Sequence, residues 1–197
     1  MLAIACYGCA LRLDSNQNPS HFFVPIYAKR CTSEHLAECL AHFESAAALA
    51  EHPGEVAIAL WFHDAIYDPR RGDNEAASAQ WAARELGAAA VAADVIARVR
   101  QLILVTCHDA QPGSADERLM VDIDLGMLGA DAARFAQYDA QVAAEYAWVP
   151  RWLYRRKRRA VLQAFLARPA IYATPVFAQR FEAAARRNLA AAVASLA

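Results

Sequence analysis

The chain has 197 residues, of which 57% are apolar and 21% are charged, and this balance is typical of a folded globular protein. A formal net charge of −1 excludes a generally basic nucleic-acid coat protein, and no apolar run reaches the roughly 18 residues of a membrane span. The five cysteines are odd in number and sparse, so we expect a reducing, cytoplasmic setting rather than a disulfide-stapled secreted fold.

Alanine supplies 48 positions, whereas glycine supplies 7 and proline 8, which favours long helices and predicts an all-α fold. Residues 1–31 are the exception, because the segment DSNQNPS and Pro25 are typical of irregular structure. Cys6 and Cys9 form a C-x-x-C pair there, which we interpret as incidental because no second pair accompanies it. The remainder, residues 32–197, is predicted to form one bundle-like domain, since no linker rich in Gly, Ser or Pro divides it.

Apolar residues recur at helical spacing through this domain, and Pro and Gly residues mark the breaks, which predicts seven or eight helices. Thr32 or Ser33 can cap the first helix, and Asp73 can cap the third, which we expect to end before Gly87. The predicted helices span residues 32–51, 55–67, 74–86, 90–107, 117–129, 131–147, 151–167 and 176–195.

Three spaced polar elements are candidates for chemistry: His35 in SEHLAECL, the pair His63 and Asp64 in LWFHDAIYDP, and Asp124 in VDIDLGMLG. Burying an imidazole and a carboxylate at the end of an apolar helix is costly unless each finds a partner or a metal ion. Adjacent helical residues point about 100° apart, so an ion at the helix edge can take one ligand from each. A structural salt bridge is the alternative interpretation of the pair.

The order of these residues resembles the HD-domain superfamily of metal-dependent phosphohydrolases, which have a His, then a His-Asp pair, then a distant Asp on an all-helical core. The blocks WFHDAIYDPRRGDNEAASA, VDIDLGMLG, YAWVP and VLQAFLARPAIYATPVF are similar to a bacterial subfamily of predicted HD phosphohydrolases of this size. The resemblance covers the chain from residue 27 to residue 190 and implies an HD-type helical bundle. It implies as metal ligands His35, His63, Asp64 and Asp124, with Asp122 as the alternative to the last.

Two imidazole nitrogens and two carboxylate oxygens suit Mn, Fe, Ni, Co or Mg, and they are too poor in thiolate for a structural zinc site. Two-metal members of the superfamily add further histidines between the His-Asp pair and the last Asp, and here only His108 lies in that interval. His42 shares a helix face with His35 but lies about 10.5 Å further along the axis. We therefore expect one divalent metal ion.

Acidic residues that follow the His-Asp pair are candidates for proton transfer. Asp73 can instead cap a helix, and Glu75 at a helix start is favoured by the helix dipole without any catalytic role. Similarity to a DNE motif of the family favours Glu75 as the residue that handles the proton, with Asp68 as the second candidate. His108 ends a predicted helix, where a cation is stabilised in any case, and it matches a family position, which makes it a candidate phosphate contact.

Six basic residues lie within the nine positions of the run RWLYRRKRR, and such a run is usually a solvated helix face. Its consecutive basic residues cover every side of a helix, which disfavours a nucleic-acid groove. Single arginines such as Arg159 can still bind a substrate phosphate through two parallel donors. The alternative is a nucleic-acid or partner-binding module that uses residues 151–159.

These observations predict a metal-dependent phosphohydrolase in which a metal-activated water attacks a phosphomonoester or nucleotide-type substrate. The alternative is a catalytically impaired HD protein that binds a metal or ligand in a regulatory role. The expected partner is a small phosphorylated molecule rather than a membrane or a nucleic acid, and a homo-oligomer is compatible with the sequence.

Overall fold

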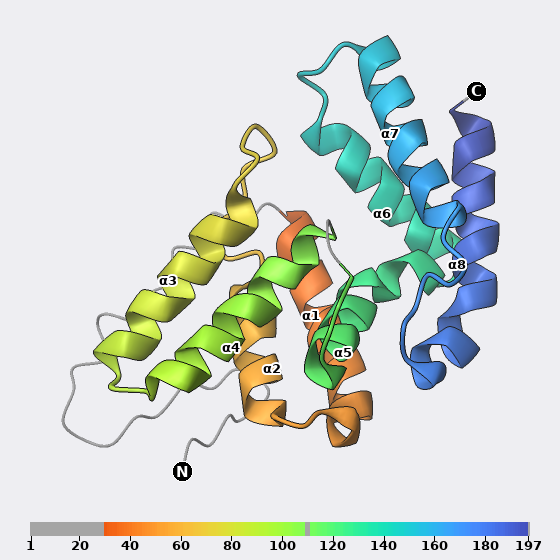
Figure 1. The fold of residues 1–197 in the computed structure, drawn as a ribbon. Helices are drawn as coiled ribbons and strands as arrows, with labels where there is room; N and C mark the ends of the chain where they lie inside the picture. The colour runs from red at the N-terminus through yellow and green to blue at the C-terminus, as the bar shows by residue number, and fades with distance from the viewer. Residues whose placement is uncertain (1–29, 109–110, 197) are drawn as a thin grey trace.

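The computed structural model describes residues 30–108 and 111–196, and every regular element in these two ranges is helical (Figure 1). The all-α prediction is thereby confirmed, whereas the irregular segment predicted for residues 1–31, with Cys6 and Cys9, falls outside the described residues up to residue 29. Within the described ranges, no helix combines the length and apolar character that crossing a membrane requires. The helices are α1 (Arg30–Ala46), α2 (Pro53–Phe62), α3 (Asn74–Ala88), α4 (Ala93–Leu104), α5 (Ala115–Asp124), α6 (Ala132–Glu145), α7 (Arg151–Leu166) and α8 (Pro175–Ser195), with the 3-10 turns η2 (Ala47–Leu49), η3 (Val105–Cys107) and η4 (Leu125–Gly129).

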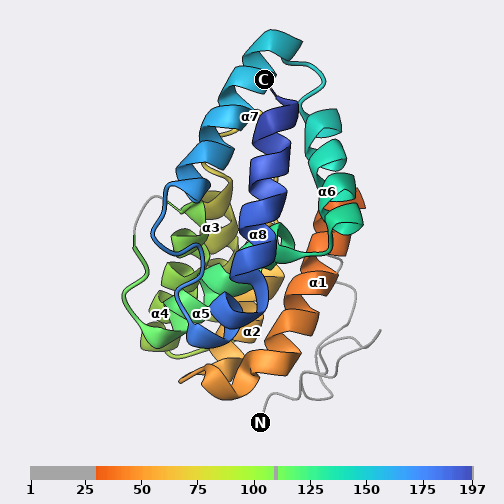
Figure 2. The same cartoon turned by 90° about the vertical axis from the view of Figure 1, so that its right-hand side faces the viewer.

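Helices α1, α2 and α5 lie between two outer groups of helices (Figures 1 and 2). On one side α3 and α4 form a hairpin that packs on α2, and on the other side α8 packs against α7 and η4. The core is made of apolar side chains from all of these elements, including the fully buried Leu60, Ile103 and Leu189. Removing each of these side chains from water contributes about 1.5–3 kcal/mol to folding.

Helix α2 ends at Phe62, so the predicted helix 55–67 is wrong over its last five residues. The start of α3 holds the following loop in place: the Ser78 hydroxyl accepts a hydrogen bond from the Ile66 amide, and the Asn74 side chain bonds both the amide and the carbonyl of Asp68. These tertiary bonds replace the intrahelical bonds that continued helix would have made.

Helix α3 begins at Asn74 as predicted, but its cap and its last residues differ from the prediction. The Asp73 side chain does not cap the helix; it forms a two-pronged ion pair with Arg71 instead. The helix continues through Gly87 to Ala88 and is closed by Ala90, which adopts a left-handed conformation with φ of 56° and donates its amide to the Gly87 carbonyl. Packing against α4 offsets the cost of about 1 kcal/mol for a glycine inside a helix.

The segment α5–η4 crosses the centre of the molecule and ends in a region of very close packing. Helix α5 begins with a capping box in which Ser114 and Glu117 bond each other's backbone amides. In η4, a Cβ atom on Gly129 would lie 2.5 Å from the Cβ of Phe181 on α8, so only glycine permits this approach. The prediction of a helix over 117–129 is thus correct in place, with its last turns drawn tighter into a 3-10 geometry.

Candidate metal centre

His63 lies at the end of α2 and is 2% exposed. Its Nδ1 donates a hydrogen bond to the Leu60 carbonyl oxygen at 2.8 Å. Because neutral imidazole carries one proton, this bond fixes the tautomer and leaves the lone pair on Nε2. His63 Nε2 is 3.3 Å from His35 Nε2 of α1 and 3.6 Å from a carboxylate oxygen of Asp124.

Asp124, at the end of α5, joins three histidines. Its Oδ1 accepts a hydrogen bond from His35 Nε2 at 2.9 Å, and its Oδ2 accepts one from His108 Nε2 at 3.0 Å. Burial by itself would raise the pKa of Asp124, but the hydrogen bonds from His108 and His35, with the His63 imidazole close by, hold it well below its usual range. The carboxylate is therefore charged at neutral pH.

The pKa values of His35 and His63 are raised, whereas that of Asp124 is lowered. Burial opposes protonation of His35, yet Cys39 and Asp124 beside it raise its pKa well above the usual value. Burial also opposes protonation of His63, whereas the nearby carboxylates of Asp124 and Asp64 raise its pKa. A carboxylate that attracts protons onto two adjacent imidazoles marks a place where a cation is favoured.

The donor atoms fit a metal ion. Within the described residues, one group of metal-ligating side chains places four ligand atoms within 4.8 Å of one another. Donors held about 2.0–2.3 Å from a tetrahedral ion lie roughly 3.3–3.8 Å apart. The His35–His63 and His63–Asp124 distances of 3.3 and 3.6 Å fall in this range, and the hydrogen-bonded pair His35 Nε2 and Asp124 Oδ1 is closer, at 2.9 Å. The group consists of His35, Cys39, His63 and Asp124.

Two carboxylates predicted from the sequence, Asp64 and Asp122, lie outside the group of four ligands. Asp64 lies beside the group, with an oxygen 3.7 Å from His63 Nε2 and a side chain that is 30% exposed. Asp122 points elsewhere: its carboxylate accepts hydrogen bonds from the Ala173 amide and from the amide and hydroxyl of Thr174. It therefore anchors the loop before α8, and Asp124 is the residue that meets the histidines.

Cys39 is the ligand-type residue that the sequence analysis did not select. It follows His35 by one helical turn on α1 and is 1% exposed. The i, i+4 spacing in HLAEC places both side chains on the same helix face, and this spacing was the signal available in the sequence.

A cavity of about 280 Å³ opens over the group of ligands. Of the predicted catalytic and phosphate-binding residues, Glu75 and His108 line it, while Arg159 does not and is exposed. The neighbouring Arg158 lines the cavity in its place, and its guanidinium is held by Asp139 at 2.8 Å. In the basic run of α7, Arg158 lines the cavity, Arg155 is half-buried, and the exposed members are Arg151, Arg156, Lys157 and Arg159.

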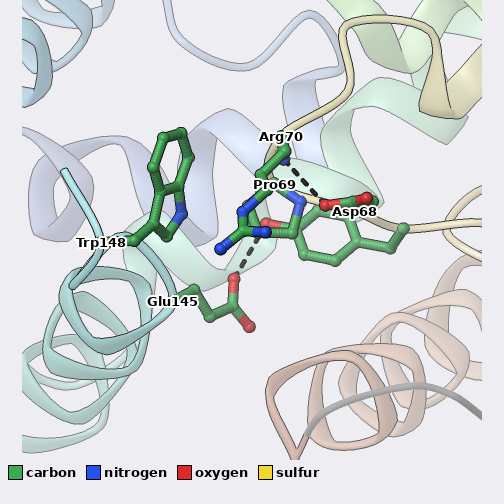
Figure 3. Close-up of a pocket in the computed structure, with 6 residues that line it drawn as sticks. Asp68, Pro69, Arg70, Glu145 and Trp148 are labelled. Atoms are coloured by element: carbon green, nitrogen blue, oxygen red, sulfur yellow. Dashed lines mark hydrogen bonds between the residues drawn. The ribbon is translucent and has the colours of Figure 1, made fainter.

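Asp68 lies in a second hollow of about 380 Å³ next to this cavity, together with Arg70 and Trp148 (Figure 3). Tyr67 and Glu145 line both spaces, and the Tyr67 hydroxyl donates to a carboxylate oxygen of Glu145 at 2.9 Å. The Asp68 carboxylate accepts a hydrogen bond from the Arg70 amide, which ties it to its own loop. Of the two predicted proton-transfer residues, only Glu75 shares the cavity with the ligands.

Comparison of the chain with protein-family models, curated proteins and solved structures found no match. The chemistry of the site is therefore inferred from its own geometry. That geometry is a largely buried group of imidazole, thiol and carboxylate side chains below a cavity whose wall also carries one arginine and the carboxylates of Asp64, Glu75 and Glu145.

Proposed function

We propose that the protein is a metal-dependent phosphohydrolase of the HD type. The observation that carries the proposal is the convergence of His35, His63 and Asp124, with Asp64 beside them, at one wall of a cavity large enough for a small molecule. The chain brings these side chains from α1, the end of α2 and the end of α5, up to 89 residues apart.

The ligand residues would hold one divalent ion, since the described residues contain one such group. A divalent ion bound there supplies Lewis acidity toward a phosphoryl oxygen and lowers the pKa of a nearby water molecule. The Leu60 carbonyl orients His63, and Asp64, on the exposed side, adds a negative charge that favours the ion.

Two residues on the cavity wall are suited to the substrate. Arg158 offers a planar cation that binds phosphate oxygens through parallel donors, and its bond to Asp139 fixes its position. Glu75 and Glu145 both line the cavity above the ligands. Glu145 accepts a hydrogen bond from the Tyr67 hydroxyl, so we assign Glu75 as the carboxylate that accepts or delivers a proton.

The test is elemental analysis of the purified protein followed by a screen of phosphorylated metabolites. We expect about one divalent ion per chain and release of inorganic phosphate from a small phosphoester. In the matched pair Arg158→Gln and Arg159→Gln, we expect only the first to raise KM, because only Arg158 lines the cavity. A protein that binds no divalent ion and hydrolyses no phosphoester would contradict the proposal.

A further inference from the structure

We propose that Cys39 is itself a ligand of the metal ion, so that the site selects an ion that accepts thiolate, such as Zn²⁺, Co²⁺ or Fe²⁺, over Mg²⁺ or Mn²⁺. This inference rests on the proposed metal site and specifies which ion it takes. It also revises the expectation from sequence, where a set of nitrogen and oxygen donors alone included Mg²⁺ among the candidates.

The first support is the position of the sulfur atom. Cys39 Sγ lies 3.6 Å from His35 Nε2 and within 4.8 Å of the donor atoms of His63 and Asp124. With metal–sulfur and metal–nitrogen bonds of about 2.3 and 2.0 Å, a tetrahedral ion places S and N roughly 3.5 Å apart. The sulfur is thus already at ligand spacing from the His35 imidazole.

The second support is how α1 presents the residue. His35 and Cys39 stand one turn apart on the same helix face, so both point toward the end of α5. The alternative is that Cys39 is a small core residue whose thiol donates to the Ile123 carbonyl. That contact is 3.9 Å long, at the far limit for sulfur, whereas the sulfur approaches the imidazole more closely.

The chemistry follows from the softness of sulfur. On binding, the S–H bond of Cys39 breaks, its proton passes to solvent, and the thiolate donates an electron pair to the ion. Thiolate stabilises Zn²⁺, Co²⁺ and Fe²⁺ far more than the hard ions Mg²⁺ and Mn²⁺. Selectivity among metals, rather than overall ligand number, is the property that Cys39 would determine.

The experiment is titration of the metal-free full-length protein with Co²⁺, followed by absorption spectroscopy. We expect a visible cobalt band that reports binding and a near-ultraviolet sulfur-to-cobalt charge-transfer band that reports thiolate ligation. Cys39→Ala should abolish the charge-transfer band. It should also lower the affinity for Co²⁺ and Zn²⁺ by more than the roughly 10- to 100-fold lost when a residue that only supports a ligand is removed. The affinity for Mg²⁺ should change much less. Cys39→Ser provides a second variant of nearly equal size.

Two matched controls assign the band to this sulfur. Cys107→Ser changes an exposed thiol outside the ligand group, and a triple variant replaces Cys6, Cys9 and Cys31 with serine. Both should keep the charge-transfer band. Loss of the band in either control, with its retention in Cys39→Ala, would overturn the assignment.

The outcomes separate this inference from the function on which it rests. Cobalt that binds with a visible band but without charge transfer would overturn Cys39 as a ligand and leave the metal site intact. A protein that binds no Co²⁺ would overturn both, and the fault would then lie with the metal site itself.

Discussion

Replacing Asp64 with asparagine is expected to weaken metal binding while the fold persists. The side chain is 30% exposed and its nearest oxygen lies 3.7 Å from His63 Nε2, on the cavity side of the ligands. Asparagine has nearly the same shape but no charge, so the substitution changes electrostatics and leaves packing unaltered. Metal occupancy and phosphatase activity should fall together, the activity by several orders of magnitude.

The expected loss of stability is small. Two unit charges 3.7 Å apart interact by about 1 kcal/mol in a water-like medium, and solvent screening at a partly exposed site reduces the value. The unfolding temperature should therefore fall by about 2–4 °C at most for a domain of this size. A carboxylate in a fully buried ion pair would instead cost about 3–5 kcal/mol when neutralised.

Asp124→Asn is the matched comparison, because it removes the same charge from a site that bonds His35 and His108. Here we expect loss of metal together with about 3–5 kcal/mol of stability. The assay is thermal unfolding in the presence of a chelator, with metal content and phosphate release measured on the same preparations. An Asp64→Asn protein that keeps its metal and the parental rate, or that is as unstable as Asp124→Asn, would refute the reasoning.

Three further predictions concern packing, pH and the basic helix. Gly129→Ala should destabilise the protein by about 1–3 kcal/mol, because the new Cβ would clash with Phe181. Gly72→Ala is the control: Gly72 has open space around it, so the unfolding temperature should not change. Equal effects of the two substitutions would contradict the close packing of η4. Metal-free protein should lose stability as pH rises above about 6.5, because the pKa of His35 is raised in the folded state. The stabilisation from protonated His35 is complete below the pKa of the unfolded chain and is lost as pH rises through the pKa of the folded protein. An unfolding temperature that stays flat or rises between about pH 6 and 9 would contradict this prediction. Duplex DNA should bind α7 only weakly, and its affinity should fall steeply with salt; tight binding that survives about 200 mM salt would favour the nucleic-acid module instead.

The sequence by itself determined the helical elements and the identity of the central histidines and carboxylates. Helix periodicity acts over a few positions, so the predicted helices agree with α3, α4, α6, α7 and α8 to within about three residues at their ends. The predictions for α1 and α5 agree as closely once the turns η2 and η4 that continue these helices are included. The predicted caps were wrong, because α1 begins before Thr32 and Ser33 and the Asp73 side chain does not cap α3. His35, His63 and Asp124 could be selected from the sequence because the resemblance depends on the order of these residues along the chain and not on how the helices pack. The structure brings these three side chains together.

Other features were decided only by the tertiary structure. Residues two apart on a helix point about 200° apart, so the sequence alone left open whether Asp122 or Asp124 faces the histidines. In the structure, Asp122 instead binds the loop at Thr174, which precedes α8. In the same way, the rotation of α7 turned Arg158 rather than Arg159 into the cavity.

The end of α2 and the inclusion of Cys39 have the same cause. The helix ends at Phe62 because the following loop bonds to Ser78 and Asn74, which lie 12 and 6 residues beyond their partners in the chain. Local helix propensity does not encode these bonds. Cys39 is a ligand-type residue only because the end of α5, 84 residues later, lies opposite it. Local pattern determines which face of a helix is buried, whereas the choice of neighbour on that face depends on how distant segments pack.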